Sequence, residues 1–198
     1  MAAGLALVGC NPRAHAVASA APPAASTAAA PAAPASVPSP AGAPDARPPT
    51  YANPVIPGTA PDPSAVRVGE DYYLVTSSFE YFPGVPLYHS RDLVHWRQLG
   101  HVLSRDAQLD LRGIPSSQGI YAPTIRHHDG TYYVVTTNMQ GGGSFYVKAT
   151  APTGPWSDPI FVREAEFTMD PSLFFDDDGK AYYTRHGGGR EGGIYQAE

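Results

Sequence analysis

Two aspartates stand in the same short motif at distant points of the chain. Asp62 begins one Asp-Pro-Ser motif and Asp170 begins another, each about ten residues before a Tyr-Tyr pair. Carboxylates that meet in one site can perform acid–base chemistry, because neighbouring charges set different pKa values for them. The alternative is that Asp-Pro simply starts a chain reversal, as it often does.

The motif belongs to a repeated unit. Tyr-Tyr pairs begin at residues 72, 132 and 182, a period of 50 to 60 residues. Such a period, with about four short strands per unit, indicates a β-propeller, in which the first strand of each blade lines the axis. Asp62 and Asp170 should then face one axial pocket. The second unit has Ala122 at this position, and the loss of Asp from one unit favours a function for the other two.

The segments after residue 50 predict an all-β fold. They are rich in β-branched and aromatic residues and are separated by Gly, Pro and Asp turns, which leaves little room for a helix. The segments expected to contain strands are DYYLVTSSF, VPLYHS, RDLVHWRQLG, GTYYVVTTN, SFYVKAT, GPWSDPIFV, PSLFFDDDGKAYYT and GGIYQAE. They make about two and a half blades, so the propeller is expected to be incomplete.

Several smaller features have structural interpretations. Trp96 and Trp156 fall at equivalent places in their units and are expected to pack between sheets. The run at residues 126–128, Arg-His-His, is predicted to be a solvated turn. The run Asp-Asp-Asp-Gly at 176–179 lacks the spaced ligands of a calcium loop and predicts a tight hairpin.

Composition excludes several classes of function. The formal net charge is -5 and no basic run occurs, so a nucleic-acid partner is not expected. The single cysteine, Cys10, excludes a disulfide framework and a multi-cysteine metal site. No segment after it is long and apolar enough to span a bilayer.

The N-terminal quarter is expected to be an anchor and a tether. Residues 1–10 end in LALVGC, which resembles a bacterial lipobox and predicts lipidation of Cys10; the alternative is the poorly assigned N-terminus of a secreted protein. Residues 11–50 are Ala/Pro-rich and predict a disordered linker. The expected location is secreted or attached to the cell envelope of a bacterium.

Residues 51–198 resemble the start of the catalytic domain of glycoside hydrolase family 43, of the β-xylosidase and α-L-arabinofuranosidase type. The resemblance is carried, in order, by four motifs: NPVIPGTAPDPSAVRVGEDYYLVTSSFEYFPGVPLYHSRDLVHWRQLG, GIYAPTIRHHDGTYYVV, GPWSDPI and MDPSLFFDDDGKAYY. It implies a five-bladed β-propeller with three central carboxylates. Asp62 matches the general base, and Asp170 matches the residue that tunes the pKa of the acid and orients the substrate. Phe79 matches an aromatic position of the substrate subsite, with a core Phe at a strand end as the alternative, and Tyr121 stands where many relatives have a Trp that lines the subsite.

The third carboxylate, the general acid, has no match in this chain. The family places it in a motif similar to EGPH, and Glu191 in GREGGIY lacks the Pro and the His. Inversion needs a base and an acid roughly 6.5–9.5 Å apart, with water between the base and the sugar. Losing the acid typically costs about 10²–10⁴-fold in rate, so this chain alone is expected to be inactive and a longer parent to be the enzyme.

The resemblance implies an oligosaccharide derived from xylan or arabinan as the substrate, and no cofactor or metal is assigned. A second hypothesis is a carbohydrate-binding propeller that keeps the pocket without the acid. A third, weaker one is a truncated gene without a functional product. A Glu in an EGPH-like motif downstream distinguishes the first two hypotheses.

Overall fold

Antiparallel β-sheets make up the regular structure of the described residues. The computed structural model describes residues 50–163, 168–187 and 192–198. All regular elements within these residues are β-strands. The predicted all-β class is therefore confirmed for this part of the chain, where no helix could cross a membrane. Cys10 and the expected lipobox, the linker up to residue 49, and Glu191 lie outside the described residues.

Two of the sheets have four strands, and each strand pairs with the next one along the chain. The first sheet contains β1 (Ser64–Val68), β2 (Asp71–Val75), β3 (Gly84–Ser90) and β4 (Arg97–Leu103). The second contains β5 (Ile120–His128), β6 (Thr131–Asn138), β7 (Gly143–Ala149) and β8 (Ile160–Phe161). The last strand of the second sheet is short because the two prolines before it, Pro155 and Pro159, cannot donate to a ladder.

The third sheet has three strands in the order β11-β10-β9. They are β9 (Thr168–Phe175), β10 (Ala181–Gly187) and β11 (Gly193–Ala197). All three Tyr-Tyr pairs lie on the second strand of their sheet, at the positions that the repeat predicted. The described residues thus form three similar meanders but no closed propeller.

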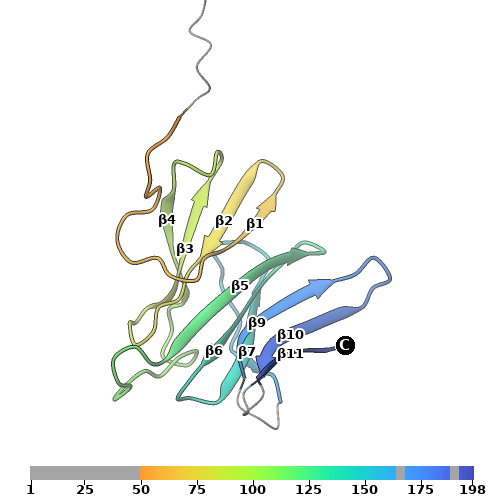
Figure 1. Cartoon of the computed structure of the whole chain (residues 1–198). Coiled ribbons are helices and arrows are strands. Elements are labelled where there is room, and N and C mark those ends of the chain that lie inside the picture. Colours follow the sequence, from red (N-terminus) through yellow and green to blue (C-terminus); the bar gives the residue numbers. More distant parts are fainter. Residues whose placement is uncertain (1–49, 164–167, 188–191) are drawn as a thin grey trace, which may run out of the picture. The chain divides into compact units, whose positions relative to one another are not determined.

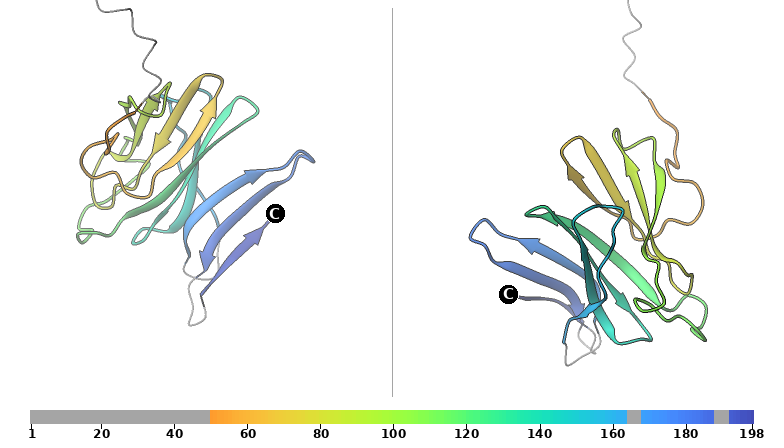
Figure 2. Two further views of the ribbon diagram at one scale, coloured as in Figure 1. Left: turned by 45° about the horizontal axis from the view of Figure 1, so that its top comes forward. Right: turned by 180° about the vertical axis from the view of Figure 1, so that it is seen from behind.

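The second sheet lies between the other two (Figures 1 and 2), and its first strand contacts the first strand of each neighbour. β5 packs against β1 on one side and against β9 on the other. The motifs at the starts of these three strands are therefore brought to one region of the fold.

A hydrophobic core fills the space between the first and second sheets. Val75, Val85 and Ile125 are completely buried there, and Val134 and Trp156 are almost so. Alternate residues of a strand point to opposite faces, which places these side chains on the inner faces. The prediction that Trp156 packs inside the fold is confirmed.

Trp96 differs from that prediction. It is half-buried, its Nε1 donates to the carbonyl of Leu93 at 2.9 Å, and it lines an apolar groove with Val55, Ile56 and Leu74. Trp96 therefore borders a groove shared with the N-terminal segment of the described chain, and it is not among the residues of the core between the first and second sheets.

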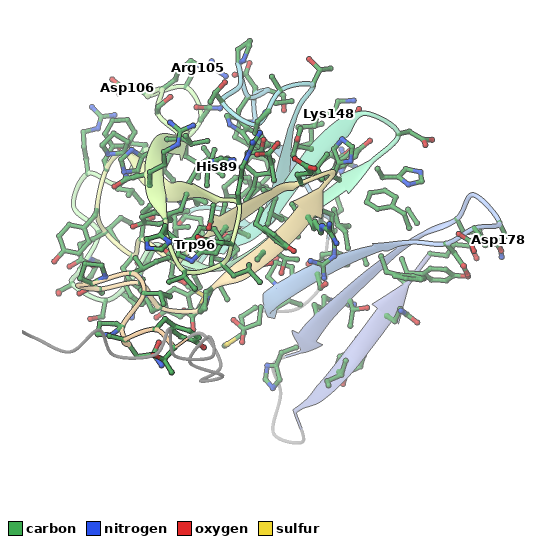
Figure 3. The ribbon with its side chains drawn as sticks, turned by 90° about the horizontal axis from the view of Figure 1, so that it is seen from above. His89, Trp96, Arg105, Asp106, Lys148 and Asp178 are labelled. Atoms are coloured by element: carbon green, nitrogen blue, oxygen red, sulfur yellow. The ribbon has the colours of Figure 1, made fainter. Side chains whose placement is uncertain are left out.

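The structure confirms one turn prediction and corrects another. Residues 176–179 form the tight turn between β9 and β10, with Asp178 at its tip (Figure 3). Residues 126–128 are not a solvated turn, because β5 continues to His128. The Arg126 side chain is half-buried. The His128 ring stacks on the Phe175 ring of β9, with ring centroids 4.5 Å apart.

Candidate functional site

Asp62-Pro63, Ala122-Pro123 and Asp170-Pro171 lie at the starting end of the first strand of their sheets, where strand pairing is interrupted. Pro63 lies directly before β1, and the pairing of β5 with β6 shifts register across Ala122-Pro123. The pairing of β9 with β10 shifts register across Asp170-Pro171. Proline has no N–H to give to the ladder, so each motif loosens the starting end of a first strand. These ends carry the candidate residues.

The two aspartates share a backbone conformation that the third motif lacks. Asp62 has φ of +52° and Asp170 has φ of +54°, whereas Ala122 is not among the residues with positive φ. The left-handed region costs an L-residue roughly 1–2 kcal/mol, and Asp is one of the few types that enter it regularly. Both side chains are exposed. The motif therefore presents two carboxylates to solvent near the strand starts.

A buried serine holds the first carboxylate. The Ser77 hydroxyl donates a 2.6 Å hydrogen bond to Oδ2 of Asp62, and the Ser77 N–H donates to the carbonyl of Pro61 at 3.1 Å. Hydrogen bonds to an ionised acceptor are short and comparatively strong. Ser77 thereby fixes the orientation of the Asp62 carboxylate, and among the described residues no donor bonds its other oxygen.

Phe79 and Tyr121 form one aromatic corner beside this end of the strands. Their rings meet edge to face, with centroids 5.6 Å apart and planes at 81°. Phe79 and Ile120 exchange two backbone hydrogen bonds of 2.9 and 3.0 Å, which tie the corner together. Gly119 permits this approach, because a Cβ there would lie 2.5 Å from the Phe79 carbonyl oxygen.

The Tyr121 hydroxyl is already engaged in the protein. It donates to the carbonyl of Ser117 at 2.9 Å, so the ring is fixed by its tip as well as by Phe79. Rigid aromatic rings with exposed faces are suited to stacking on the apolar face of a sugar. Phe79 and Tyr121 are both half-buried, which leaves part of each ring accessible.

Contacts join the predicted residues into two groups. Asp62 is bonded to Ser77, and Phe79 touches Tyr121, but no described contact joins Asp62 to Asp170. The sequence did not identify Ser77. The polar run Thr-Ser-Ser at the end of β2 could have indicated it, because a buried polar run needs hydrogen-bond partners.

Glu80 is the nearest glutamate in sequence to the aromatic corner. Its own backbone N–H, the Ser116 hydroxyl and the Ser117 N–H all donate to the carboxylate and lower its pKa. A general acid needs a raised pKa to stay protonated near neutral pH. Glu80 is therefore poorly suited to that role. The described residues also hold no cluster of three His, Cys, Asp or Glu side chains that could bind a metal ion.

Comparison with known proteins gives one consistent family. The family described as Glycosyl hydrolases family 43 matches residues 51–198. The Xylosidase/arabinosidase of Butyrivibrio fibrisolvens is 55% identical over 132 residues, which are 66% of this chain and 25% of that protein. The Non-reducing end alpha-L-arabinofuranosidase BoGH43B of Bacteroides ovatus is 56% identical over 138 residues, 68% of this chain and 26% of that protein.

Solved structures agree with these relatives. The structure titled Bacteroides ovatus Xyloglucan PUL GH43B matches with a TM-score of 0.64 and 48% identity, over 73% of this chain and 32% of that one. The chain spans about a quarter of the length of the curated relatives that it matches.

Proposed function

The chain belongs to glycosyl hydrolases family 43, and from that premise we propose that it supplies the base side of the active site of a glycoside hydrolase. The proposed substrates are oligosaccharides derived from xylan or arabinan, cleaved by an inverting mechanism. The observation that carries the proposal is the geometry of Asp62, an exposed carboxylate that a buried serine orients at the start of the first strand.

Asp62 is proposed to be the general base. Its carboxylate accepts a proton from a water molecule while the water oxygen forms a bond to the anomeric carbon. The bond from that carbon to the leaving oxygen breaks, and the leaving oxygen takes a proton from an acid on the opposite face. Ser77 donates to only one carboxylate oxygen, so the other is available to the water.

Asp170 is proposed to act on that acid and on the substrate. A second carboxylate close to the acid raises its pKa by like-charge repulsion and keeps it protonated near neutral pH. The acid itself is assigned to no residue of this chain. We propose that the three described sheets are the first blades of a five-bladed propeller. A later blade would then provide the general acid.

The aromatic corner is proposed to bind the terminal sugar. Phe79 and Tyr121 offer a rigid apolar wall, and the names of the relatives include both xylosidase and arabinosidase. Phe79 bonds Ile120 at the start of β5, and the two aspartates lie near the starts of β1 and β9, the strands that pack against β5, which supports one shared sugar site.

The test is hydrolysis by the intact protein that carries this chain. We expect release of 4-nitrophenol from its β-xyloside or its α-arabinofuranoside, and a loss of at least about 10²-fold in kcat for Asp62→Asn, since base catalysis contributes that much. A protein that binds these sugars but hydrolyses neither would identify a carbohydrate-binding propeller, the second candidate, for which the aromatic corner alone suffices.

Location is a separate proposal. The sequence LALVGC supports lipidation of Cys10 and attachment to a bacterial cell envelope, or secretion if that cysteine stays unmodified. Mass spectrometry of the N-terminal peptide from the native host decides between the two, because a lipidated cysteine carries the added mass of its acyl chains.

A further inference from the structure

Arg126 joins the second and third sheets next to Asp170. Its Nε donates to the carbonyl of Leu173 at 2.9 Å, and its Nη2 donates to the Ser172 hydroxyl at 3.0 Å. Its Nη1 donates to the carbonyl of Ile125 at 2.9 Å, which fixes the guanidinium on its own strand. The rigid fork of an arginine suits such a multiple contact, which a lysine could not reproduce.

The bonded residues follow directly after the Asp170-Pro171 step. That step is where the register between β9 and β10 shifts, so the third sheet holds the backbone least firmly there. Arg126 supplies an anchor from the neighbouring sheet at the first residues after the shift. Within the described residues no ion pair involves Arg126, so its donors serve the strand and do not neutralise a carboxylate.

The other Asp-Pro-Ser motif has a matching anchor on the same strand. The N–H of Ile125 donates to the Ser64 hydroxyl at 3.2 Å. β5 is the outer strand of its sheet, so this N–H is available to a neighbouring sheet. The serines of both motifs thus bond to consecutive residues of β5, Ser64 to the backbone N–H of Ile125 and Ser172 to the side chain of Arg126.

We propose that Arg126 is a positioning residue for Asp170. It holds Ser172 and Leu173 against β5, the strand on which Ser64 anchors the Asp62 motif, and so fixes the separation of the two carboxylates. We call these contacts of Arg126 with Ser172 and Leu173 the clamp, and its catalytic role rests on the function proposed above. Loss of the clamp should lower the rate, because a catalytic group misplaced by about 1 Å costs roughly 10²-fold.

Arg126→Met in the intact protein tests the inference, because methionine keeps an apolar stem and removes every donor. The matched control is Arg105→Met. Arg105 (Figure 3) also joins distant segments, through Nη2 to the Trp156 carbonyl at 3.1 Å and to Asp158 at 2.7 Å, but it touches neither motif. The measurements are kcat and KM on the 4-nitrophenyl glycosides and the exchange rates of the backbone amides in β9.

For Arg126→Met we expect kcat to fall about 10–100-fold with KM within about twofold, and faster amide exchange in β9. For Arg105→Met we expect kcat within about twofold of the wild type. An unchanged kcat in Arg126→Met, an equal loss in Arg105→Met, or unchanged exchange in β9 would overturn the inference. A wild-type protein without hydrolytic activity would refute the proposed function. Amide exchange in β9 would then be the only test of whether Arg126 holds that strand in place.

Discussion

At the scale of residues, Asp62 and Asp170 share a backbone conformation that the third equivalent position does not adopt. Both have positive φ, and the equivalent Ala122 does not. Such strain persists only where the surroundings hold it, and it often marks functional sites. The Ser77 hydroxyl helps to hold the conformation of Asp62. The Arg126 guanidinium helps to hold the strand beside Asp170.

Ser77→Ala should lower kcat about tenfold with little change in KM. The variant loses a hydrogen bond to a charged group, worth about 1.5–3 kcal/mol, and frees the base to rotate. The adjacent Ser78→Ala is the control, because the Ser78 hydroxyl accepts from the Val85 N–H and does not contact Asp62. Steady-state kinetics of both variants check this, and equal losses in kcat would contradict it.

The sequence could predict the residues that repeat but not their partners. Asp62 and Asp170 were visible because the Asp-Pro-Ser motif recurs before two of the three Tyr-Tyr pairs. The run Arg-His-His at 126–128 predicts a solvated turn, whereas Arg126 bonds Ser172, which lies 46 positions away. A local pattern carries no information about a contact of that range.

At the scale of elements, Tyr132 shows how β6 is fastened to the first sheet. Its ring meets Tyr73 edge to face at 5.5 Å, and burial, together with the neighbouring Tyr73 hydroxyl, raises the pKa of Tyr132 to about 12. An unfolded tyrosine has a pKa of about 10. The neutral phenol is therefore favoured in the fold, and its contribution is complete below pH 10 and is lost as pH rises toward 12.

Tyr132→Phe should consequently flatten the alkaline side of the stability profile. Chemical unfolding at pH 8 and at pH 11 is the measurement, and the wild type should lose more free energy of unfolding between the two than the variant. An identical loss in both proteins would show that ionisation of Tyr132 is not linked to unfolding.

The hairpin of residues 176–179 gives a second prediction for an element. Gly179 has φ of +85°, which a side chain tolerates poorly, so Gly179→Ala should destabilise the protein by about 1 kcal/mol. Thermal unfolding of the wild type and of Gly179→Ala measures this difference.

The same run should not bind calcium, so calcium should leave the melting temperature unchanged. A rise in melting temperature with calcium would contradict the assignment of residues 176–179 as a simple turn.

Elements were easier to predict than their ends. The Tyr-Tyr strands followed from β-branched and aromatic residues between turn residues, and they lie where expected. The composition of the segment DYYLVTSSF predicts a strand but not its last residue, and β2 ends at Val75. Beyond it the chain turns toward β5 to bond Ile120, a tertiary contact that no propensity describes.

At the scale of the whole molecule, the third sheet exposes several large apolar side chains. Ile194 is 82% exposed, Phe174 55% and Tyr195 50%. Exposed apolar side chains beside an outer strand favour association of chains. The chain of 198 residues by itself should therefore self-associate as its concentration rises, and Ile194→Thr should weaken this. Sedimentation velocity checks it, and a wild type that stays monomeric at every concentration would contradict it.

The central claim is that Asp62 is the base of a glycoside hydrolase, and one pair of variants tests it most directly. Asp62→Asn and Asp178→Asn each remove one exposed carboxylate, and Asp178 lies at a hairpin tip outside the site. In the intact protein we predict that release of 4-nitrophenol from the β-xyloside or the α-arabinofuranoside falls at least about 10²-fold for Asp62→Asn and stays at the wild-type rate for Asp178→Asn. Full activity of Asp62→Asn would contradict the account.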